Sequence, residues 1–140
     1  MRTMKIVGFG LWLALMMTAC KDDDEAVSQC DLLEGTWQTE SWKEDGEEFF
    51  GDTIFIITSE MTFHPADSSG RGNLNWDITY LIGGTENIIG SYQLNESCDE
   101  VTLIPKDGAP STYSFTVSGD ELTLSAEINA VEIEMQLRKE

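Results

Sequence analysis

The sequence predicts an all-β domain, a small antiparallel meander β-barrel of about eight strands. Apolar and polar residues alternate with a period of two over much of the chain, most clearly in residues 131–138. Turn signals such as Asp45-Gly46 and Gly83-Gly84 recur about every 8 to 12 residues. No useful helical period interrupts this pattern, so we expect no C-terminal helix. Because one face of the strands is apolar and the chain is short, closure into a barrel is the simplest way to bury that face.

The expected strands follow one another along the chain, each ending at a turn signal. Residues 118–120 form a turn between two alternating segments, which predicts a hairpin. The expected strand ranges are 35–44, 52–59, 61–64, 73–82, 87–94, 101–105, 113–117, 121–125 and 131–138. The residues from Cys30 onward are enough for one domain with a real core.

The N-terminal end has the layout of a bacterial signal peptide. Arg2 and Lys5 precede an apolar run over residues 6–17, and Thr18-Ala19 supplies small residues before a cleavage point. A bilayer takes about 20 apolar residues to cross, so this shorter run predicts a targeting segment rather than a membrane anchor. We expect residues 1–19 to be removed.

The segment around Cys20 indicates a lipid anchor. Met17-Thr18-Ala19-Cys20 resembles the lipobox of bacterial lipoproteins, which implies that Cys20 becomes the first mature residue and carries acyl chains such as palmitate. Two or more acyl chains give stable attachment to a membrane. The alternative is an ordinary secreted protein in which Cys20 is only a thiol.

An acidic stretch, Lys21-Asp22-Asp23-Asp24-Glu25, follows directly. It resembles the tract that exports lipoproteins to the outer face of the outer membrane in one large group of Gram-negative anaerobes. This resemblance implies a lipid-anchored protein facing the cell exterior. A solvated tether over residues 20–30 is compatible with that role, since like charges repel and bury no apolar area. A cation site is a third alternative, but consecutive carboxylates lack the spacing of a calcium loop.

Charge and cysteine count limit the partners and the compartment. Without the signal peptide, 26 acidic residues face 6 basic ones, a formal charge of −20. Such a field repels nucleic acid and anionic lipid surfaces. We expect a monomer whose membrane contact is the lipid anchor. If Cys20 carries lipid, Cys30 and Cys98 remain as one pair, and we predict a disulfide between them. Two free buried thiols are the alternative.

A family resemblance enters at Leu33-Glu34-Gly35-Thr36-Trp37, which resembles the G-x-W motif of lipocalins and of lipocalin-like domains in bacterial lipoproteins. The resemblance covers roughly residues 32–139, within an expected domain at 31–140. It implies a barrel whose first-strand Trp37 lies at the closed end beneath an arginine from the last strand, here Arg138. That contact would be a cation–π interaction. A second family motif and a C-terminal helix are missing, and the chain is shorter than most lipocalins.

Residues that could perform catalysis are few. His64 is the only histidine, so no multi-histidine zinc site can form. A triad of His64 with Asp67 and Ser68 or Ser69 would lie within one loop, whereas triads assemble from distant segments. Carboxylate pairs for an acid-catalysed hydrolase are too common here to be a signal. We therefore expect a non-enzymatic protein with no catalytic residue, metal or cofactor.

Two further predictions concern modification and ligand binding. Asp52-Thr53-Ile54 resembles an O-glycosylation acceptor, with Thr53 as the modified residue. Five aromatic residues share the apolar parity of neighbouring strands and either line a cup or fill the barrel. They are Trp76, Tyr80, Tyr92, Tyr113 and Phe115. We expect a surface-exposed binding domain for a small apolar molecule, a glycan or a protein; the alternative is a structural accessory subunit of an outer-membrane complex with a filled barrel.

Overall fold

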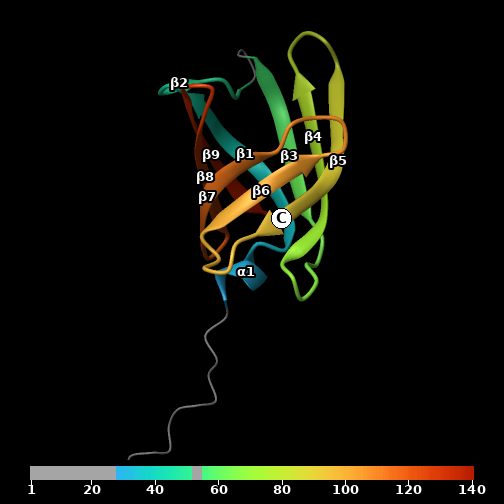
Figure 1. Cartoon of the computed structure of the whole chain (residues 1–140). Coiled ribbons are helices and arrows are strands. Elements are labelled where there is room, and N and C mark those ends of the chain that lie inside the picture. The colour runs from blue at the N-terminus through green and yellow to red at the C-terminus, as the bar shows by residue number, and fades with distance from the viewer. Residues whose placement is uncertain (1–27, 52–54) are drawn as a thin grey trace, which may run out of the picture.

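A computed structural model describes residues 28–51 and 55–140 of the chain (Figure 1). The expected signal peptide at 1–19, the lipidation site Cys20, the acidic stretch 21–25 and the glycosylation site Thr53 lie outside the described residues. Within these residues, no helix is long and apolar enough to cross a membrane.

The described residues form one antiparallel sheet that closes on itself, preceded by a short helix (Figure 1). The elements are α1 (Gln29–Leu32), β1 (Gly35–Glu44), β2 (Glu47–Glu48), β3 (Ile56–Phe63), β4 (Arg71–Tyr80), β5 (Thr85–Leu94), β6 (Glu100–Pro105), β7 (Ser111–Ser118), β8 (Glu121–Ile128) and β9 (Val131–Lys139). Consecutive strands pair from β3 to β9, and β1 closes the barrel between β3 and β9. The predicted meander barrel of about eight strands is confirmed; β2 is a small addition that pairs only with the end of β1.

Three elements differ from the predicted strand list. The expected strands 52–59 and 61–64 are one strand, β3, which continues through Ser59-Glu60. Ser59 is fully buried although it is polar, because its hydroxyl oxygen accepts hydrogen bonds from Thr39 Oγ1 and Trp76 Nε1, both at 2.9 Å. The sequence did not predict α1 and β2, which have four and two residues and are too short to show a period.

A β-bulge in β1 changes which side chains enter the barrel. Thr39 lies opposite Leu137 and Ser41 opposite Gln136, so Glu40 is an extra residue that bulges out to solvent. An extra residue shifts the alternation by one position. As a result Thr39 and Trp42 both have the parity of the inward residues of β9, although they are three positions apart.

The end of the barrel that carries α1, the loop 64–70 and the turns 95–99 and 118–120 is closed; we call it the closed end. In Figure 1 it lies at the bottom, where the chain enters α1. Leu33, which follows α1, is fully buried, and its carbonyl accepts a hydrogen bond from Trp37 Nε1 at 2.9 Å. Gln29 completes the closure, since its side-chain amide donates to Val117 O at 3.2 Å and accepts from Val117 N at 2.9 Å. The amide thereby makes the two hydrogen bonds that a neighbouring strand would make at Val117, where β7 extends past its pairing with β6.

The opposite end, called the open end, carries the β1–β2 turn, the β4–β5 tip at 81–84, the loop 106–110 and the β8–β9 turn (Figure 1). The β4 and β5 strands reach further here than β6, because β5 pairs with β6 only from Gly90, opposite Pro105, onward. A Cβ atom on Gly90 would lie 2.1 Å from Ile104 O. Only glycine therefore lets β5 and β6 approach closely at Gly90, where their pairing ends.

Candidate functional site

Four of the five candidate ligand-lining aromatics lie in the packed core of the barrel. Trp76, Tyr92, Tyr113 and Phe115 are buried, and Trp76, the most accessible, is 8% exposed. Phe63 meets Tyr92 edge to face at 5.2 Å between ring centroids. Tyr80 is only partly buried and lies near the open end. These side chains therefore fill the middle of the barrel and do not line a deep cup.

At the closed end, the structure corrects the predicted partner of Trp37. The first and last strands pair as expected, but Trp37 lies opposite Lys139, and Arg138 lies opposite Gln38. Successive residues of a strand point to opposite faces, so Arg138 faces outward and forms ion pairs with Glu40 at 2.6 Å and Glu121 at 3.5 Å. The ammonium group that covers Trp37 is that of Lys139, 5.3 Å from the ring centroid.

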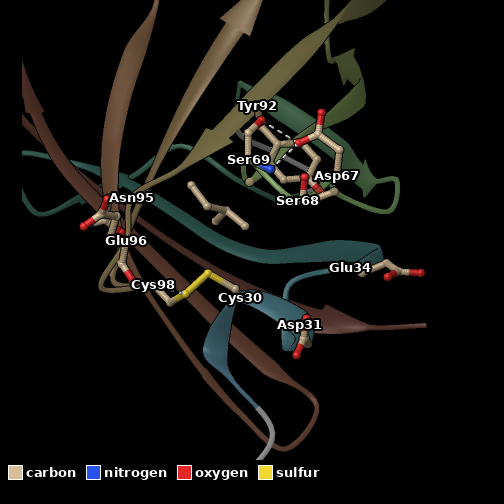
Figure 2. A pocket seen from close by; sticks show the side chains of 13 residues that line it. Cys30, Asp31, Glu34, Asp67, Ser68, Ser69, Tyr92, Asn95, Glu96 and Cys98 are labelled. Carbon is tan, nitrogen blue, oxygen red and sulfur yellow. Dashed lines mark hydrogen bonds between the residues drawn. A yellow bond between two sulfur atoms is a disulfide. The ribbon is translucent and has the colours of Figure 1, made fainter.

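The predicted disulfide is present. Cys30 of α1 and Cys98 of the turn 95–99 are joined with their Cα atoms 5.0 Å apart, across 68 positions of sequence. The bond attaches α1 to the β5–β6 turn and so fixes the helix over the closed end. Beside it lies a hollow of about 320 Å³ (Figure 2).

This hollow at the disulfide is polar and acidic. In Figure 2 the disulfide forms one wall, Tyr92 and Ser69 face it, and Asp31 and Glu34 point away from its centre. Asp67, an acid of this hollow that lies close to Tyr92, is hydrogen-bonded within its own loop. Its Oδ1 accepts hydrogen bonds from Ser69 Oγ at 2.6 Å, Ser69 N at 2.9 Å and Arg71 N at 3.1 Å. The bond from the Ser69 hydroxyl is the main reason why the pKa of Asp67 is lowered, so this carboxylate stays ionised and is a poor general base.

The structure does not assemble the triad that the sequence analysis weighed around His64. No hydrogen bond joins His64 to Asp67, Ser68 or Ser69 in the part of the chain that the structure describes. The backbone carbonyl of His64 accepts the hydroxyl proton of Tyr92. The described residues also hold no group of three or more His, Cys, Asp or Glu side chains that is suited to a metal ion.

The open end is the less completely sealed end of the barrel. Seven apolar side chains pack on the core there and remain partly exposed, and we call them the open-end layer. They are Trp42, Phe50, Tyr80, Ile88, Ala126, Ile128 and Ile133. Trp42 stacks on Trp76 with ring centroids 5.4 Å apart and an interplanar angle of 27°. The open-end layer is thus an apolar floor built on a pair of indole rings.

Trp42 also has an unusual polar atom. Its Nε1 is buried and finds no hydrogen-bond partner among the described residues. A buried donor without a partner costs about 1 to 3 kcal/mol. By contrast, the neighbouring indole N–H of Trp76 donates to Ser59. The open-end layer therefore holds a buried indole N–H to which no described residue offers an acceptor.

Carboxylates organise the rim above this layer. Glu48 Oε1 accepts hydrogen bonds from Trp42 N at 2.8 Å and Phe50 N at 3.3 Å, and Glu48 Oε2 accepts from Ser41 Oγ at 2.7 Å. On the other side, Tyr80 donates its hydroxyl to Glu86 Oε2 at 2.8 Å. Burial and this bond to Glu86 raise the pKa of Tyr80 to about 12, so Tyr80 remains a neutral donor at physiological pH.

Sequence reasoning did not identify Trp42 as a site residue. Strict alternation from Trp37 places Trp42 on the outer face, and only the bulge at Glu40 turns it inward. The signal that could have found it is the large indole at an expected solvent position, since such residues are seldom left fully exposed.

A comparison with protein families is consistent with this architecture. The model of a family described as a lipocalin-like domain matches residues 33–124, which is more than half of the chain. No curated protein matches the chain.

Proposed function

Because the chain belongs to the lipocalin-like domain family, whose barrel typically binds small molecules and is not enzymatic, we propose that the protein is a lipid-anchored binding domain on the cell surface. Its ligand is a small, largely apolar molecule with one hydrogen-bond acceptor, and it binds on the open-end layer. The observation that carries this proposal is the unpartnered indole N–H of Trp42 in a partly exposed apolar floor.

The ligand chemistry follows from three properties of the floor. Stacked indoles and aliphatic side chains favour an apolar or aromatic body. The N–H of Trp42 is buried in the ligand-free barrel, so a ligand that displaces the side chains over it would gain a hydrogen bond by presenting a carbonyl or ether oxygen. The rim carboxylates Glu48 and Glu86 disfavour an anionic ligand. Since the core below is filled, the ligand lies at the mouth of the barrel and not deep inside.

Two fluorescent probes test this proposal. Prodan is neutral, aromatic and has one ketone oxygen, whereas N-phenyl-1-naphthylamine is of similar size and lacks a carbonyl. We expect the protein to bind both and to prefer prodan. Trp42→Phe keeps an apolar ring but removes the N–H, so it should erase the preference, a loss of about 0.5 to 1.5 kcal/mol for one hydrogen bond.

Trp76→Phe is the matched control, since its indole N–H is already used by Ser59. It should lower stability yet leave the preference for prodan unchanged. If the wild-type protein binds neither probe, the ligand proposal is rejected.

The lipid anchor fits this orientation. The described chain starts at Ser28, next to α1 at the closed end (Figure 1). The segment from Cys20 to Ser28 spans at most about 30 Å even when fully extended. A lipid on Cys20 would therefore hold the closed end near the membrane and direct the open end away from it. The acidic stretch 21–25 is then the export signal to the exterior of the outer membrane.

Two variants test the anchor in the source cells. Cys20→Ala should leave the precursor uncut or the product unattached, because the acceptor for lipid is gone. Replacing Asp22, Asp23 and Asp24 by Ala should preserve lipidation, shown by incorporation of labelled palmitate, but abolish digestion by protease added to intact cells. Unchanged digestion of the triple variant would remove the export role from this stretch.

A second function, as an accessory subunit of an outer-membrane complex, is favoured by a different observation. Large apolar residues at and near the open end are exposed to solvent: Phe55 by 59%, Leu81 by 48%, Ile82 by 87% and Ile89 by 55%. Three of these four lie on the β4–β5 hairpin, beyond or beside its pairing with β6. Exposed apolar groups on a projecting hairpin suit contact with a protein.

A further inference from the structure

We propose that the outer edge of β5, at residues 85–89, is a docking site for an extended, cationic segment of a partner protein, which adds to the sheet as a strand. This inference rests on the accessory role proposed above and needs no ligand on the open-end layer, although Ile88 of that layer and Glu86 of its rim also line the groove described below. Four observations carry it: an open hydrogen-bonding edge, an apolar groove beside it, acidic flanks, and the contrast with another strand edge that the chain itself covers.

The open edge follows from the direction of backbone groups in β5. Gly84 O accepts from Tyr80 N, so even-numbered residues direct their N–H and C=O toward β4. Ile89 O accepts from Lys106 N on the opposite side, so odd-numbered residues direct theirs away from β4. Thr85 and Asn87 therefore present their N–H and C=O groups along the outer edge, where no strand of the described chain pairs with them.

The chain treats a second such edge differently. Where β7 extends past β6, the side-chain amide of Gln29 donates to and accepts from Val117, and α1 covers the site. Unpaired strand edges invite pairing with other chains, and proteins usually cover, charge or twist them. One edge of this barrel is covered, whereas no residue in 28–51 or 55–140 pairs with the edge at Thr85 and Asn87, which is the arrangement expected if the latter is used for pairing.

A groove of about 360 Å³ runs along this edge, between β5 and the loop that follows β6. Its apolar lining comes from Ile88, Ile89, Pro105 and Ala109, and its acids are Glu86 and Asp107. Ile89 is 55% exposed. An added strand would place alternate side chains toward this groove, which offers apolar contact flanked by negative charge.

The charge decides between possible occupants. A second copy of this chain would pair β5 with β5 and bring Glu86 and Asp107 of both copies together, between two molecules that each carry a formal charge of −20 without the signal peptide. Like charges so placed oppose association. A segment with alternating apolar and basic side chains would instead gain from the same groups. The partner class is therefore an extended cationic peptide segment.

The test uses the acetylated and amidated heptapeptide Lys-Val-Lys-Val-Lys-Val-Lys as probe, with the Glu-Val-Glu-Val-Glu-Val-Glu peptide as control. We expect the Lys peptide to bind, with an affinity that falls as salt is added, and to slow hydrogen exchange at the amides of Thr85 and Asn87. The amides of Glu86 and Ile88, which point toward β4, should not change. Equal binding of the Glu peptide, or protection without this alternation, would overturn the proposal.

Asn87→Pro removes the outward N–H without removing a backbone hydrogen bond to β4, and proline is tolerated at such edge positions. The hydrogen bond that the Asn87 side chain donates to Asp77 of β4 is lost in Asn87→Ala as well, so the two variants differ in the backbone N–H. Asn87→Pro should weaken binding of the Lys peptide at least tenfold, whereas Asn87→Ala should not. Binding of prodan at the open-end layer should be the same in both variants, which separates this test from that of the ligand. The proposal fails if the Lys peptide does not bind the wild-type chain. It also fails if Thr85 and Asn87 become protected at high protein concentration without peptide, the sign of self-pairing.

Discussion

At the scale of single residues, the closed end depends on which side of β9 each basic residue occupies. Lys139 shares the inward parity of Leu137 and Met135 and covers Trp37, which is fully buried. Arg138, one position earlier, faces outward and pairs with Glu40. One position in a strand is the difference between capping the core and facing solvent.

A double-mutant cycle tests this arrangement. Trp37→Ala should cost about 3 to 5 kcal/mol of unfolding free energy, as expected for truncation of a buried aromatic. Its coupling with Lys139→Ala should be about 0.5 to 1 kcal/mol, the size of a partly exposed cation–π contact. The matched cycle with Arg138→Ala should show no coupling within error. Urea denaturation gives all the values, and coupling to Arg138 in place of Lys139 would contradict the structure.

A cluster of carboxylates on the outer face of the barrel leads to a second prediction. Partial burial, followed by the charges of Glu140 and Asp77, raises the pKa of Glu60 above its usual value. Because the folded chain holds this proton more strongly, Glu60 favours folding below about pH 4.5 and opposes it once pH rises through its folded pKa. Glu60→Gln should therefore raise the melting temperature at pH 7 and leave it unchanged near pH 3.

Glu96→Gln is the control for this substitution, since it changes the net charge equally at an exposed turn. It should have a smaller effect at pH 7. The Gln38 side chain, which donates to Glu60 Oε2 at 2.5 Å, can donate equally to the oxygen of a glutamine there. Thermal melts at the two pH values measure the difference, and destabilisation of Glu60→Gln at pH 7 would contradict the assigned pKa direction.

At the scale of elements, α1 is held by long-range bonds and not by its own length. It has four residues, too few for an independently stable helix. The disulfide joins it to the β5–β6 turn, and Gln29 joins it to β7. The element exists because the barrel end provides these partners.

The disulfide should therefore contribute strongly to stability. Replacing Cys30 and Cys98 together by Ala should lower the unfolding free energy by about 4 kcal/mol, since the bond closes a loop of 68 positions in the unfolded chain. Urea denaturation of the oxidised wild-type protein and the double variant measures the loss. Reduced wild-type protein is the control and should match the variant. A loss below about 1 kcal/mol would mean that α1 and the turn stay together without the bond.

At the scale of the whole molecule, the barrel keeps all three tyrosines of the chain in environments that oppose ionisation. Burial is the first cause in each case. It raises the pKa of Tyr92 to about 12, with Glu34 and Asp67 adding to the effect, and it also raises the pKa of Tyr113. Tyr80 behaves in the same way.

This predicts an alkaline transition. Since the folded pKa values exceed the unfolded value of about 10, the tyrosines stabilise the fold below pH 10, and that contribution is lost as pH rises toward about 12. Absorbance at 295 nm should show little tyrosinate up to about pH 11, followed by a cooperative rise together with loss of the β-sheet circular dichroism signal. Independent titration of one tyrosine near pH 10 in the folded state would contradict the burial that the structure assigns.

Local chemistry in the sequence determined the architecture. Period-two alternation, turn residues at short intervals and the absence of a helical period are enough to predict a meander barrel, because each depends on neighbours within about ten residues. Gly35-Thr36-Trp37, the segment that resembles the G-x-W motif, lies within the family match over residues 33–124. The Cys30–Cys98 bond followed from counting the cysteines left after Cys20.

Only the tertiary structure decided what the two ends of the barrel can do. Two features depend on the register between β1 and β9. The first is the bulge at Glu40, which turns Trp42 inward, and the second is the pairing that places Lys139, and not Arg138, over Trp37. The free edge at Thr85 and Asn87 depends on where β6 stops relative to β5. Strand register brings together residues that are far apart in the chain. A shift of the register by one residue moves every side chain of the strand to the opposite face of the sheet. Alternation within one strand therefore sets its period, while pairing with distant strands sets which side chains meet.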